Sequence, residues 1–472
     1  MRALRFLGVT AAVGVAALVF PALRPLFAAG QAVSVWVTTG DRSQLLASQP
    51  DLAFAPDTPS RRYLTIDVDE TITYQQMQGF GGSLTDSAAW LIANALAPAD
   101  RDALMSSLFD PAAGIGLSLL RQPIGASDFA LAHYTYDDTC CDLNDFSIEH
   151  DRTYILPLLR QALSLNPALR VMGSPWSAPA WMKDSGSLYT GKLLPQNYGI
   201  YADYFVRYVN AYRAEGVPIG FVTLQNEPHY EPPDYPGMRW GPTEEADFVK
   251  NHLGPAFAAD GISSRIVVWD HNWDEPAYPI TVLDDPAAKA YVDGSAFHCY
   301  GGSVDNQRQV HDAHPDRNIY FTECTSGEWS TNWASNLVWD FQNILIGNIR
   351  NWGVSTIKFN LALDQDNGPH TGGCTNCTAL AAINTTDGSV SYNHDFYTLG
   401  HFSKFVAPGA VRIQSNQFEQ RGIYDASFKN PDGSKVVVVL NAGHATTRFK
   451  VRWAGESILY SLPARSAATF KW

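Results

Sequence analysis

Cysteine, clustered basic residues and long hydrophobic runs are all scarce in this sequence. Six cysteines among 472 residues are too few for a disulfide scaffold. No run of lysine and arginine occurs and the formal net charge is −14, so the chain would repel a polyanion, and nucleic acid is excluded as a partner. Beyond residue 30 no stretch is long and apolar enough to cross a bilayer.

Several catalytic motifs are absent or incomplete. Residues 186–193 are close to a phosphate-binding loop, but Leu193 stands where a magnesium-binding Ser or Thr is required. Gly114 and Gly116 lack the third glycine of a dinucleotide-binding fingerprint. Neither the GxSxG motif of serine hydrolases nor the HExxH motif of metalloproteases is present. The sequence therefore implies no cofactor and no metal.

Cys374 and Cys377 are spaced like half of a zinc site. The second half is missing, because the other close pair, Cys140 and Cys141, is adjacent and cannot present two thiolates as a CxxC motif does. We therefore predict a disulfide in the loop that contains Cys374 and Cys377, in preference to a metal.

The first thirty residues are typical of a secretory signal peptide. Arg2 and Arg5 precede an apolar stretch over residues 6–23, and small residues follow it. We expect residues 1–30 to be removed on export, which leaves a secreted or periplasmic protein with no stable membrane insertion. The alternative is an uncleaved anchor helix, since the apolar stretch approaches spanning length.

From residue 79 to about residue 405, short apolar runs alternate with amphipathic stretches, as in a parallel sheet covered by helices. Helices are expected over residues 151–165, 198–215, 243–259 and 333–352. Strands are predicted at residues 78–81, 116–121, 170–174, 221–225, 266–270, 294–298, 318–323 and 355–361. Eight such units predict an α/β fold, a (β/α)8 TIM barrel, over residues 78–407.

The flanking segments have a different pattern. Residues 33–37, 63–68 and 410–472 contain short β-rich runs separated by turn residues. Because these runs come from both ends of the chain, we predict a side all-β sandwich domain that is built from both chain termini, residues 31–77 and 408–472, and packs on the barrel.

Two glutamates stand at the ends of predicted strands. Glu227 follows the fourth strand, in Asn226-Glu227-Pro228, and Glu323 ends the seventh strand. The carboxyl ends of barrel strands converge on one cleft, and glycoside hydrolysis requires two carboxyl groups on either side of the scissile bond. The alternative for either acid alone is a loop or helix-capping role.

Aromatic and polar side chains follow other predicted strands. Trp176, Trp181, Tyr300 and Trp329 could offer flat apolar faces to sugar rings, although such residues also fill cores. Arg121 and Asp128 could hydrogen-bond to sugar hydroxyls or form a structural ion pair. Asp86 and Trp90, after the first strand, are further candidates for hydrogen bonding to the sugar.

Six segments together resemble glycoside hydrolase family 30, the family of lysosomal glucosylceramidase and microbial β-1,6-glucanases. They follow one another between residues 79 and 441 in the same order as in that family. They are GFGGSLTD at 79–86, LR at 120–121 with SDF at 127–129, SPW at 174–176, NEP at 226–228, LGHFSKF at 399–405, and PDG at 431–433 followed by the apolar strand up to residue 441.

This resemblance implies retention of anomeric configuration, with Glu227 as the acid/base and Glu323 as the nucleophile. It also implies a subsite for the nonreducing-side glucose, which would contain Arg121, Asp128, Trp176, Asn226 and Tyr300. Phe359 stands where glucosylceramidase-like members carry Trp. The loop over residues 364–377 looks more like that of secreted microbial members.

We therefore expect a secreted retaining β-glycosidase that acts on a β-1,6-linked glucan by double displacement. In the free enzyme the pKa of Glu227 is predicted to lie above that of Glu323, because the acid must be protonated while the nucleophile is ionised. Glucosylceramidase is the alternative, so the substrate is a carbohydrate or a glycolipid, and the wider family includes a xylan-directed subgroup. An alternative of another class is a non-catalytic carbohydrate-binding protein on the same barrel.

Overall fold

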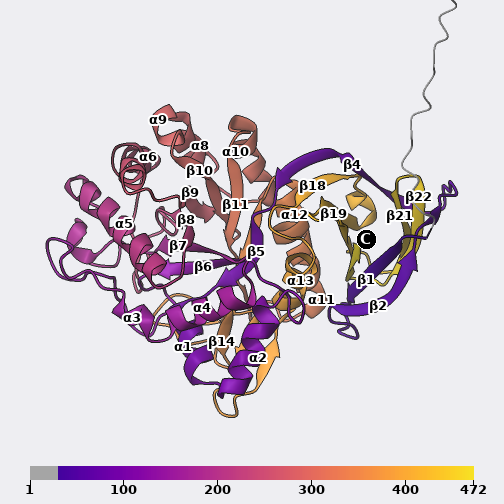
Figure 1. Cartoon of the computed structure of the whole chain (residues 1–472), viewed down its shortest axis with the longest axis horizontal. Helices are drawn as coiled ribbons and strands as arrows, with labels where there is room; N and C mark the ends of the chain where they lie inside the picture. Colours follow the sequence, from indigo (N-terminus) through magenta and orange to yellow (C-terminus); the bar gives the residue numbers. More distant parts are fainter. Residues whose placement is uncertain (1–29) are drawn as a thin grey trace, which may run out of the picture.

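The computed structural model describes residues 30–472. The expected signal segment lies outside the described residues, apart from Gly30. Within residues 30–472 no helix has the length and apolar character needed to span a membrane. Figure 1 shows a barrel of strands and helices with a second, all-β unit at its side.

Eight parallel strands form the barrel, in the order β11-β10-β9-β8-β7-β6-β5-β13. A backbone bridge between Ile319 and Gly353 brings the two end strands together. The strands are β5 (Gly79–Ser83), β6 (Leu119–Ile124), β7 (Arg170–Pro175), β8 (Ile219–Thr223), β9 (Arg265–Asn272), β10 (Val292–His298), β11 (Asn318–Glu323) and β13 (Ser355–Lys358). Each predicted strand overlaps one of these, so the predicted TIM barrel is confirmed.

Helices surround this barrel, as Figure 1 shows. They include α1 (Asp86–Asn94), α2 (Pro98–Phe109), α4 (Ile155–Leu165), α5 (Tyr198–Ala214), α8 (Ala277–Asp284), α10 (Gln307–Ala313) and α13 (His394–Ser403). Two of the predicted helices contain a π-helical turn. The first is α6 (Pro242–Phe248), the turn Val249–Leu253 and α7 (Gly254–Ala259), and the second is α11 (Trp333–Trp339), the turn Asp340–Leu345 and α12 (Ile346–Arg350).

The barrel interior changes character along its axis. Because side chains alternate along a strand, residues two apart face the same way. A buried apolar layer contains Leu119, Met172, Phe221, Val267, Ala296, Tyr320, Val354 and Ile357. Five of these strands carry a buried polar residue two positions closer to their carboxyl ends. These residues are Arg121, Ser174, Thr223, His298 and Thr322. The sequence therefore places a polar layer directly above the apolar one, where the barrel opens.

Strand β5 contributes backbone rather than side-chain volume to this arrangement. Its sequence is Gly-Phe-Gly-Gly-Ser, and a Cβ at Gly81 would lie 1.4 Å from the carbonyl oxygen of Leu119. Only glycine permits β5 and β6 to approach so closely.

The side unit is one ten-stranded sheet in the order β2-β1-β23-β20-β19-β18-β4-β21-β22-β3. Its early strands are β1 (Ala32–Thr38), β2 (Ala47–Ala53), β3 (Ala55–Pro56) and β4 (Leu64–Gln76). Its late strands are β18 (Val411–Ser415), β19 (Ile423–Lys429), β20 (Lys435–Asn441), β21 (Thr447–Trp453), β22 (Glu456–Leu462) and β23 (Ser466–Lys471). Strand β1 pairs antiparallel with β23, so strands from both ends of the chain lie side by side, as predicted (Figure 1).

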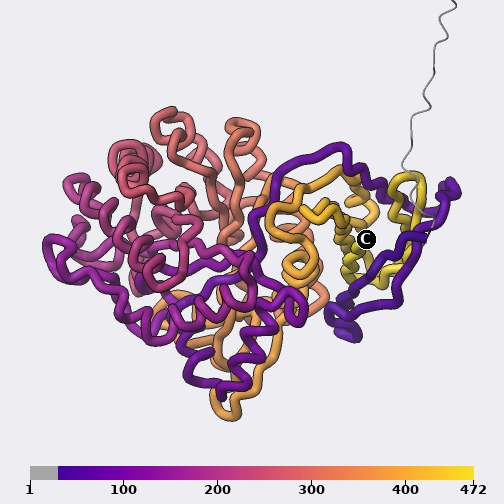
Figure 2. The backbone as a smooth tube through the Cα atoms, viewed as in Figure 1, coloured from indigo at the N-terminus to yellow at the C-terminus, as the bar shows by residue number. Residues whose placement is uncertain are grey.

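Buried polar contacts join this sheet to the barrel. His401 of α13 hydrogen-bonds to the hydroxyls of Thr469 (2.7 Å) and Thr38 (2.9 Å), and Arg350 forms an ion pair with Asp425 (2.8 Å). Burial lowers the pKa of His401 to about 3, so the imidazole stays neutral. The tube in Figure 2 shows the chain leaving the side unit after its first strands and returning to it at the end.

Candidate active site

A cavity of about 470 Å³ contains the carboxyl groups of both predicted glutamates. Its lining residues come mainly from loops that follow the carboxyl ends of the barrel strands, as expected for a TIM barrel. They are Asp128, Phe129, Trp176, Asn226, Glu227, Tyr230, Pro233, Asp234, Tyr235, Tyr300, Glu323, Thr325, Trp329, Phe359, Gly373, Cys374 and Cys377.

Glu227 lies four residues beyond β8, in a backbone conformation with φ of 52°. A positive φ is unusual for a residue with a Cβ and occurs often at functional sites. The backbone N–H of Glu227 donates to the carbonyl oxygen of Asp270 (3.1 Å). Its side-chain Oε1 lies 3.0 Å from Nδ1 of His298 and 3.6 Å from Nδ1 of His271.

Glu323 is the last residue of β11, and both of its carboxylate oxygens have donors. Arg121 forms an ion pair with Oε2, and the hydroxyl of Tyr300 donates to Oε1 (2.9 Å). A carboxylate that is held in this way keeps a fixed orientation, which a nucleophile requires.

A buried network around Asp270 joins the two glutamates. One Asp270 oxygen accepts from Arg121 (2.8 Å) and Thr223 (2.7 Å), and the other contacts Nε2 of His298 (3.0 Å) and the hydroxyl of Thr322 (2.6 Å). Arg121 contacts Glu323, and His298 contacts Glu227. Asp270 therefore sets the position of both groups that touch the paired carboxyls. Its own pKa is lowered, because the positive charges of Arg121 and His298 outweigh burial.

The pKa values of the two glutamates move in opposite directions. Burial acts to raise both, but for Glu227 the hydrogen bond from His298 and the nearby positive charges outweigh burial, and its pKa falls. For Glu323 burial prevails over the charges of His298 and Arg121, and its pKa rises. For His298, burial is outweighed by the charge of Glu323 and by hydrogen bonds to Asp270 and Glu227, which raise its pKa to about 9.

The prediction that the pKa of Glu227 lies above that of Glu323 is therefore wrong. The reason is the contact between His298 and Glu227, which belong to different strand ends and are 71 residues apart in the sequence. At neutral pH the imidazole of His298 therefore carries a proton, 3.0 Å from the carboxylate oxygen of Glu227. The titration belongs to the coupled group of side chains rather than to one residue.

One wall of the cavity is aromatic. The rings of Trp176 and Phe359 stack with centroids 5.9 Å apart and an angle of 23° between their planes. Phe129 packs on Phe359, and the guanidinium of Arg121 lies 4.7 Å from the ring centre of Trp176. The Phe359 position therefore holds the indole of Trp176 in place.

Asp128 provides an unsatisfied polar atom in the same wall. It is buried, and its Oδ1 has no hydrogen-bond partner within residues 30–472. Burial and the charge of Glu323 raise its pKa well above the ordinary value. Buried polar atoms are nearly always paired, so this oxygen is available to a ligand hydroxyl.

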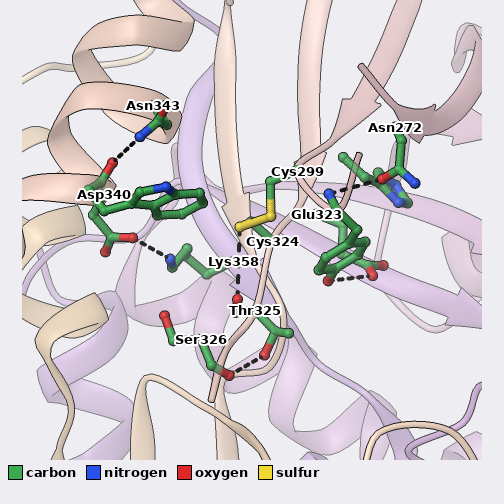
Figure 3. Close-up of a disulfide and its surroundings, with 12 residues drawn as sticks. Asn272, Cys299, Glu323, Cys324, Thr325, Ser326, Asp340, Asn343 and Lys358 are labelled. Atoms are coloured by element: carbon green, nitrogen blue, oxygen red, sulfur yellow. Dashed lines mark hydrogen bonds and ion pairs between the residues drawn. A yellow bond between two sulfur atoms is a disulfide. The ribbon is translucent and has the colours of Figure 1, made fainter. Parts of the chain in front are cut away.

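One disulfide lines the cavity and a second lies next to residues that line it. Cys374 and Cys377 are bonded to each other and line it, which confirms the predicted loop disulfide. Cys299 and Cys324 join the ends of β10 and β11, next to Tyr300 and Glu323. In Figure 3 this second disulfide lies between Glu323 on one side and the Asp340–Lys358 ion pair on the other. Cys140 and Cys141 form the remaining pair.

The structure brings together nine of the twelve residues that the sequence analysis considered for the site: the two glutamates, Arg121, Asp128, Trp176, Asn226, Tyr300, Trp329 and Phe359. Arg121 reaches it through its contacts with Asn226 (2.7 Å) and Glu323, and the others line the cavity. Three further candidates lie elsewhere. Trp181 donates to the carbonyl of Asp137, Asp86 contacts His150 (2.7 Å), and Trp90 packs against the barrel's outer core.

Sequence reasoning missed Asp270, His271 and His298. Asp270 and His298 are the last residues of two predicted strands, and His271 follows directly. The rule that selected Glu227 and Glu323, that functional side chains stand at strand ends, also applies to them. Asp234 and Tyr235 were missed as well, and their loop carries no comparable signal.

A barrel with paired glutamates at the ends of its fourth and seventh strands, in a cavity with aromatic walls, defines a glycoside hydrolase. The model of the glycosyl hydrolase family 30 TIM-barrel domain matches residues 77–406, and that of the family 30 beta sandwich domain matches residues 409–470. The chain belongs to glycoside hydrolase family 30.

Its similarity to individual family members extends over most of the chain. An endo-1,6-beta-D-glucanase of Neurospora crassa is 35% identical over 82% of this chain and 83% of its own. Lysosomal acid glucosylceramidase of Mus musculus is 31% identical over 78% of this chain and 75% of its own. The solved structure of the endo-beta1,6-glucanase BT3312 has a TM-score of 0.89 at 33% identity, with 93% of this chain and 99% of that chain covered.

Proposed function

We propose that this protein is an exported retaining glycosidase that hydrolyses β-1,6-linked glucan. The observation that carries the choice of substrate is the composition of the cavity walls. Within the described part of the chain, no Leu, Ile, Val or Met lines the catalytic cavity, while aromatic, acidic and amide side chains do. A sugar chain presents hydroxyls and flat apolar faces, which such walls fit, whereas a ceramide needs an aliphatic rim.

In the proposed cycle Glu323 attacks the anomeric carbon while the carboxyl of Glu227 gives its proton to the departing glycosidic oxygen. Water, deprotonated by Glu227, then breaks the glycosyl–Glu323 ester and releases the sugar with its original configuration. Trp176, Phe359 and Asp128 form the subsite for the glucose that is attacked. Asn226, which accepts a hydrogen bond from Arg121, uses its amide to contact the 2-hydroxyl.

His298 holds the proton for this cycle. Before the substrate binds, the imidazole is charged and Glu227 is ionised. Transfer of the proton from Nδ1 to Oε1 leaves a neutral imidazole and a protonated acid, with the number of bound protons unchanged. The Nε2–H of His298 keeps its hydrogen bond to Asp270. His298 is thus a positioning residue that acts through Glu227.

A bell-shaped pH profile of kcat/KM is expected from these groups. Activity should fall as pH rises through about 9, because the pair Glu227–His298 then loses its one proton. On the acid side it should fall as Glu323 is protonated, at a pH above the ordinary 4.5. In His298→Asn the alkaline limb should move down by about one pH unit or more, since Glu227 then holds the proton alone.

A matched control for this measurement is His229→Gln, because His229 pairs with Glu275 (2.8 Å) and does not line the cavity. If the alkaline limb of the pH profile lies at the same pH in His298→Asn as in the wild type, His298 does not hold the proton for the cycle.

A second cavity of about 510 Å³ adjoins the first and shares Tyr300, Thr325 and Trp329 with it. Trp339 also lines it, and Trp329 and Trp339 are both exposed. A bound chain can therefore continue past the catalytic cavity over aromatic faces. We expect Trp329→Ala to raise KM for long β-1,6-glucan about tenfold, at about 1.4 kcal/mol of lost binding, and to leave hydrolysis of an aryl β-glucoside unchanged.

The control for Trp329→Ala is Tyr291→Ala, since Tyr291 is an exposed aromatic residue that lines neither cavity. An equal loss on polymer and aryl glucoside would show that Trp329 supports the catalytic groups instead of the chain.

The proposed substrate is tested by comparing kcat/KM on a panel of β-1,6-glucan, β-1,3-glucan, glucuronoxylan, glucosylceramide in detergent micelles and an aryl β-glucoside. We expect β-1,6-glucan to be the best natural substrate. Faster release of ceramide than of glucan oligosaccharides would reverse the choice. Binding of glucan without hydrolysis of any member would instead identify a non-catalytic carbohydrate-binding protein.

Export is proposed from the sequence of residues 1–30. Amino-terminal sequencing of the protein from the extracellular or periplasmic fraction should find a start near residue 31. A chain that retains Arg2 and Arg5 and sediments with membranes would show that the segment is an anchor.

A further inference from the structure

Glu227, which lines the catalytic cavity, and two histidines behind it form a group that resembles a metal site. Oε1 of Glu227, Nδ1 of His271 and Nδ1 of His298 all lie within 4.8 Å of one another. The shorter separations are 3.0 Å between Glu227 and His298 and 3.6 Å between Glu227 and His271. Two imidazoles and one carboxylate are a common ligand set for Zn²⁺, with a fourth position left open.

His271 supplies an independent observation. The residue is only 9% exposed, and its Nδ1 has no hydrogen-bond partner within residues 30–472. Buried ring nitrogens are almost always paired. The glycosidase cycle described above gives Nδ1 of His271 no task. The nitrogen nevertheless lies 3.6 Å from Oε1 of Glu227, a residue that lines the cavity.

His298 has the support that metal-bound histidines usually have. Its Nε2 contacts Oδ1 of Asp270 (3.0 Å), and Thr322 donates to the same oxygen (2.6 Å). Such a carboxylate behind the ring fixes the imidazole and directs the other nitrogen toward the ligand. Nδ1 of His298 points in this way at Glu227.

A second cluster, of two carboxylates and one imidazole, is already occupied by a cationic side chain. Asp340, His394 and Asp395 also lie within ligand distance of one another. The ammonium of Lys358 already lies among them, 3.0 Å from Asp340 and 2.5 Å from Asp395. That cluster is neutralised by a lysine, whereas no lysine contacts Glu227, His271 or His298 among the described residues.

We propose that Glu227, His271 and His298 form an inhibitory site for Zn²⁺ and similar borderline-soft divalent cations. The bound ion is coordinated by Oε1 of Glu227, which then cannot carry the proton that the cycle needs. The open coordination position of the ion faces the cavity, and hydrolysis stops until the ion dissociates. Mg²⁺ and Ca²⁺ prefer all-oxygen ligands and bind poorly here. The enzyme is thus switched off by a cation that it does not need for catalysis.

Binding is tested without any substrate by titrating the whole protein with Co²⁺ and recording its visible absorption. The titration is run at about pH 8, where fewer protons compete for the imidazoles. We expect one Co²⁺ per chain with the intense bands of a four-coordinate site, and loss of these bands when Zn²⁺ is added. Inhibition by Zn²⁺, assayed on the best substrate of the panel, should follow the same affinity, and excess Mg²⁺ should not inhibit.

His271→Gln removes one ligand and should weaken both Co²⁺ binding and inhibition by Zn²⁺ about 100-fold. His229→Gln is the matched control and should leave both unchanged, because that histidine pairs with Glu275 outside the cavity. If His271→Gln does not fold, as judged by its thermal unfolding, Glu227→Gln removes a different ligand and should abolish the bands.

Absence of four-coordinate Co²⁺ bands in the wild-type protein, or equal metal affinity in His271→Gln and the wild type, would overturn the proposal. The titration uses no glycoside, so its outcome is separate from that of the proposed function. A protein that binds Co²⁺ at this site and hydrolyses none of the panel would refute the function alone.

Discussion

Replacing Glu323 by Gln is expected to lower kcat by about 10⁴-fold or more while the protein stays folded. The amide cannot form the glycosyl ester on which retention depends. The substitution conserves size, and Tyr300 and Arg121 still surround the side chain. The kinetic loss should therefore be accompanied by an unchanged thermal unfolding midpoint and unchanged binding of the glucan.

The role of Glu323 is checked independently by chemical labelling. A 2-deoxy-2-fluoroglucoside with a good leaving group should attach to Glu323 and to no other residue, and peptide mapping identifies the site. The first sugar released, followed by NMR, should have the β configuration. Release of the α anomer would exclude double displacement. A retaining mechanism also requires the two carboxyl groups to stand about 5–5.5 Å apart in a crystal structure.

Glu227→Ala is the second substitution with a large expected effect. Loss of the acid should lower kcat by about 10²–10⁴-fold for substrates with poor leaving groups, because general acid catalysis contributes about that much. An aryl glucoside with a good leaving group needs no proton and should still form the glycosyl-enzyme. Azide, a small anion that needs no base, should then accelerate breakdown of that intermediate and yield a β-glucosyl azide.

The leaving-group comparison distinguishes a missing acid from a damaged site. His298→Asn serves as a companion variant, since it keeps the Glu227 carboxyl and removes only the imidazole 3.0 Å away. We expect it to show a shifted pH profile and no azide effect. Equal losses for good and poor leaving groups in Glu227→Ala, with no product azide, would assign the acid to another residue.

The positions of the two glutamates could be predicted because the relevant signals are local. Glu227 and Glu323 each follow a run of strand-forming residues, and the architecture of a TIM barrel sends every such position to the same opening. The polar layer of Arg121, Ser174 and Thr223 follows from the same period of two along the strands.

Three candidates do not reach the cavity, and Asp86 and Trp181 show why. Asp86 begins a helix, and its carboxylate contacts His150 and Tyr154 instead of a cavity. Trp181 follows β7 at a greater distance than Trp176, and its indole contacts a backbone carbonyl in the outer layer. Nothing in the local sequence distinguishes a tryptophan that faces sugar from one that packs, because the side chain is the same in both.

The sequence by itself determined the eight barrel strands, the β-rich flanks and the two glutamates, since each is encoded within a few neighbouring residues. Only the tertiary structure decided how protons are distributed among Glu227, Glu323 and His298. Their charges are coupled through Asp270 and Arg121, which join separate strands over sequence separations of up to 202 residues. Burial and the distance between charges set these pKa values, and both quantities exist only once the barrel has closed.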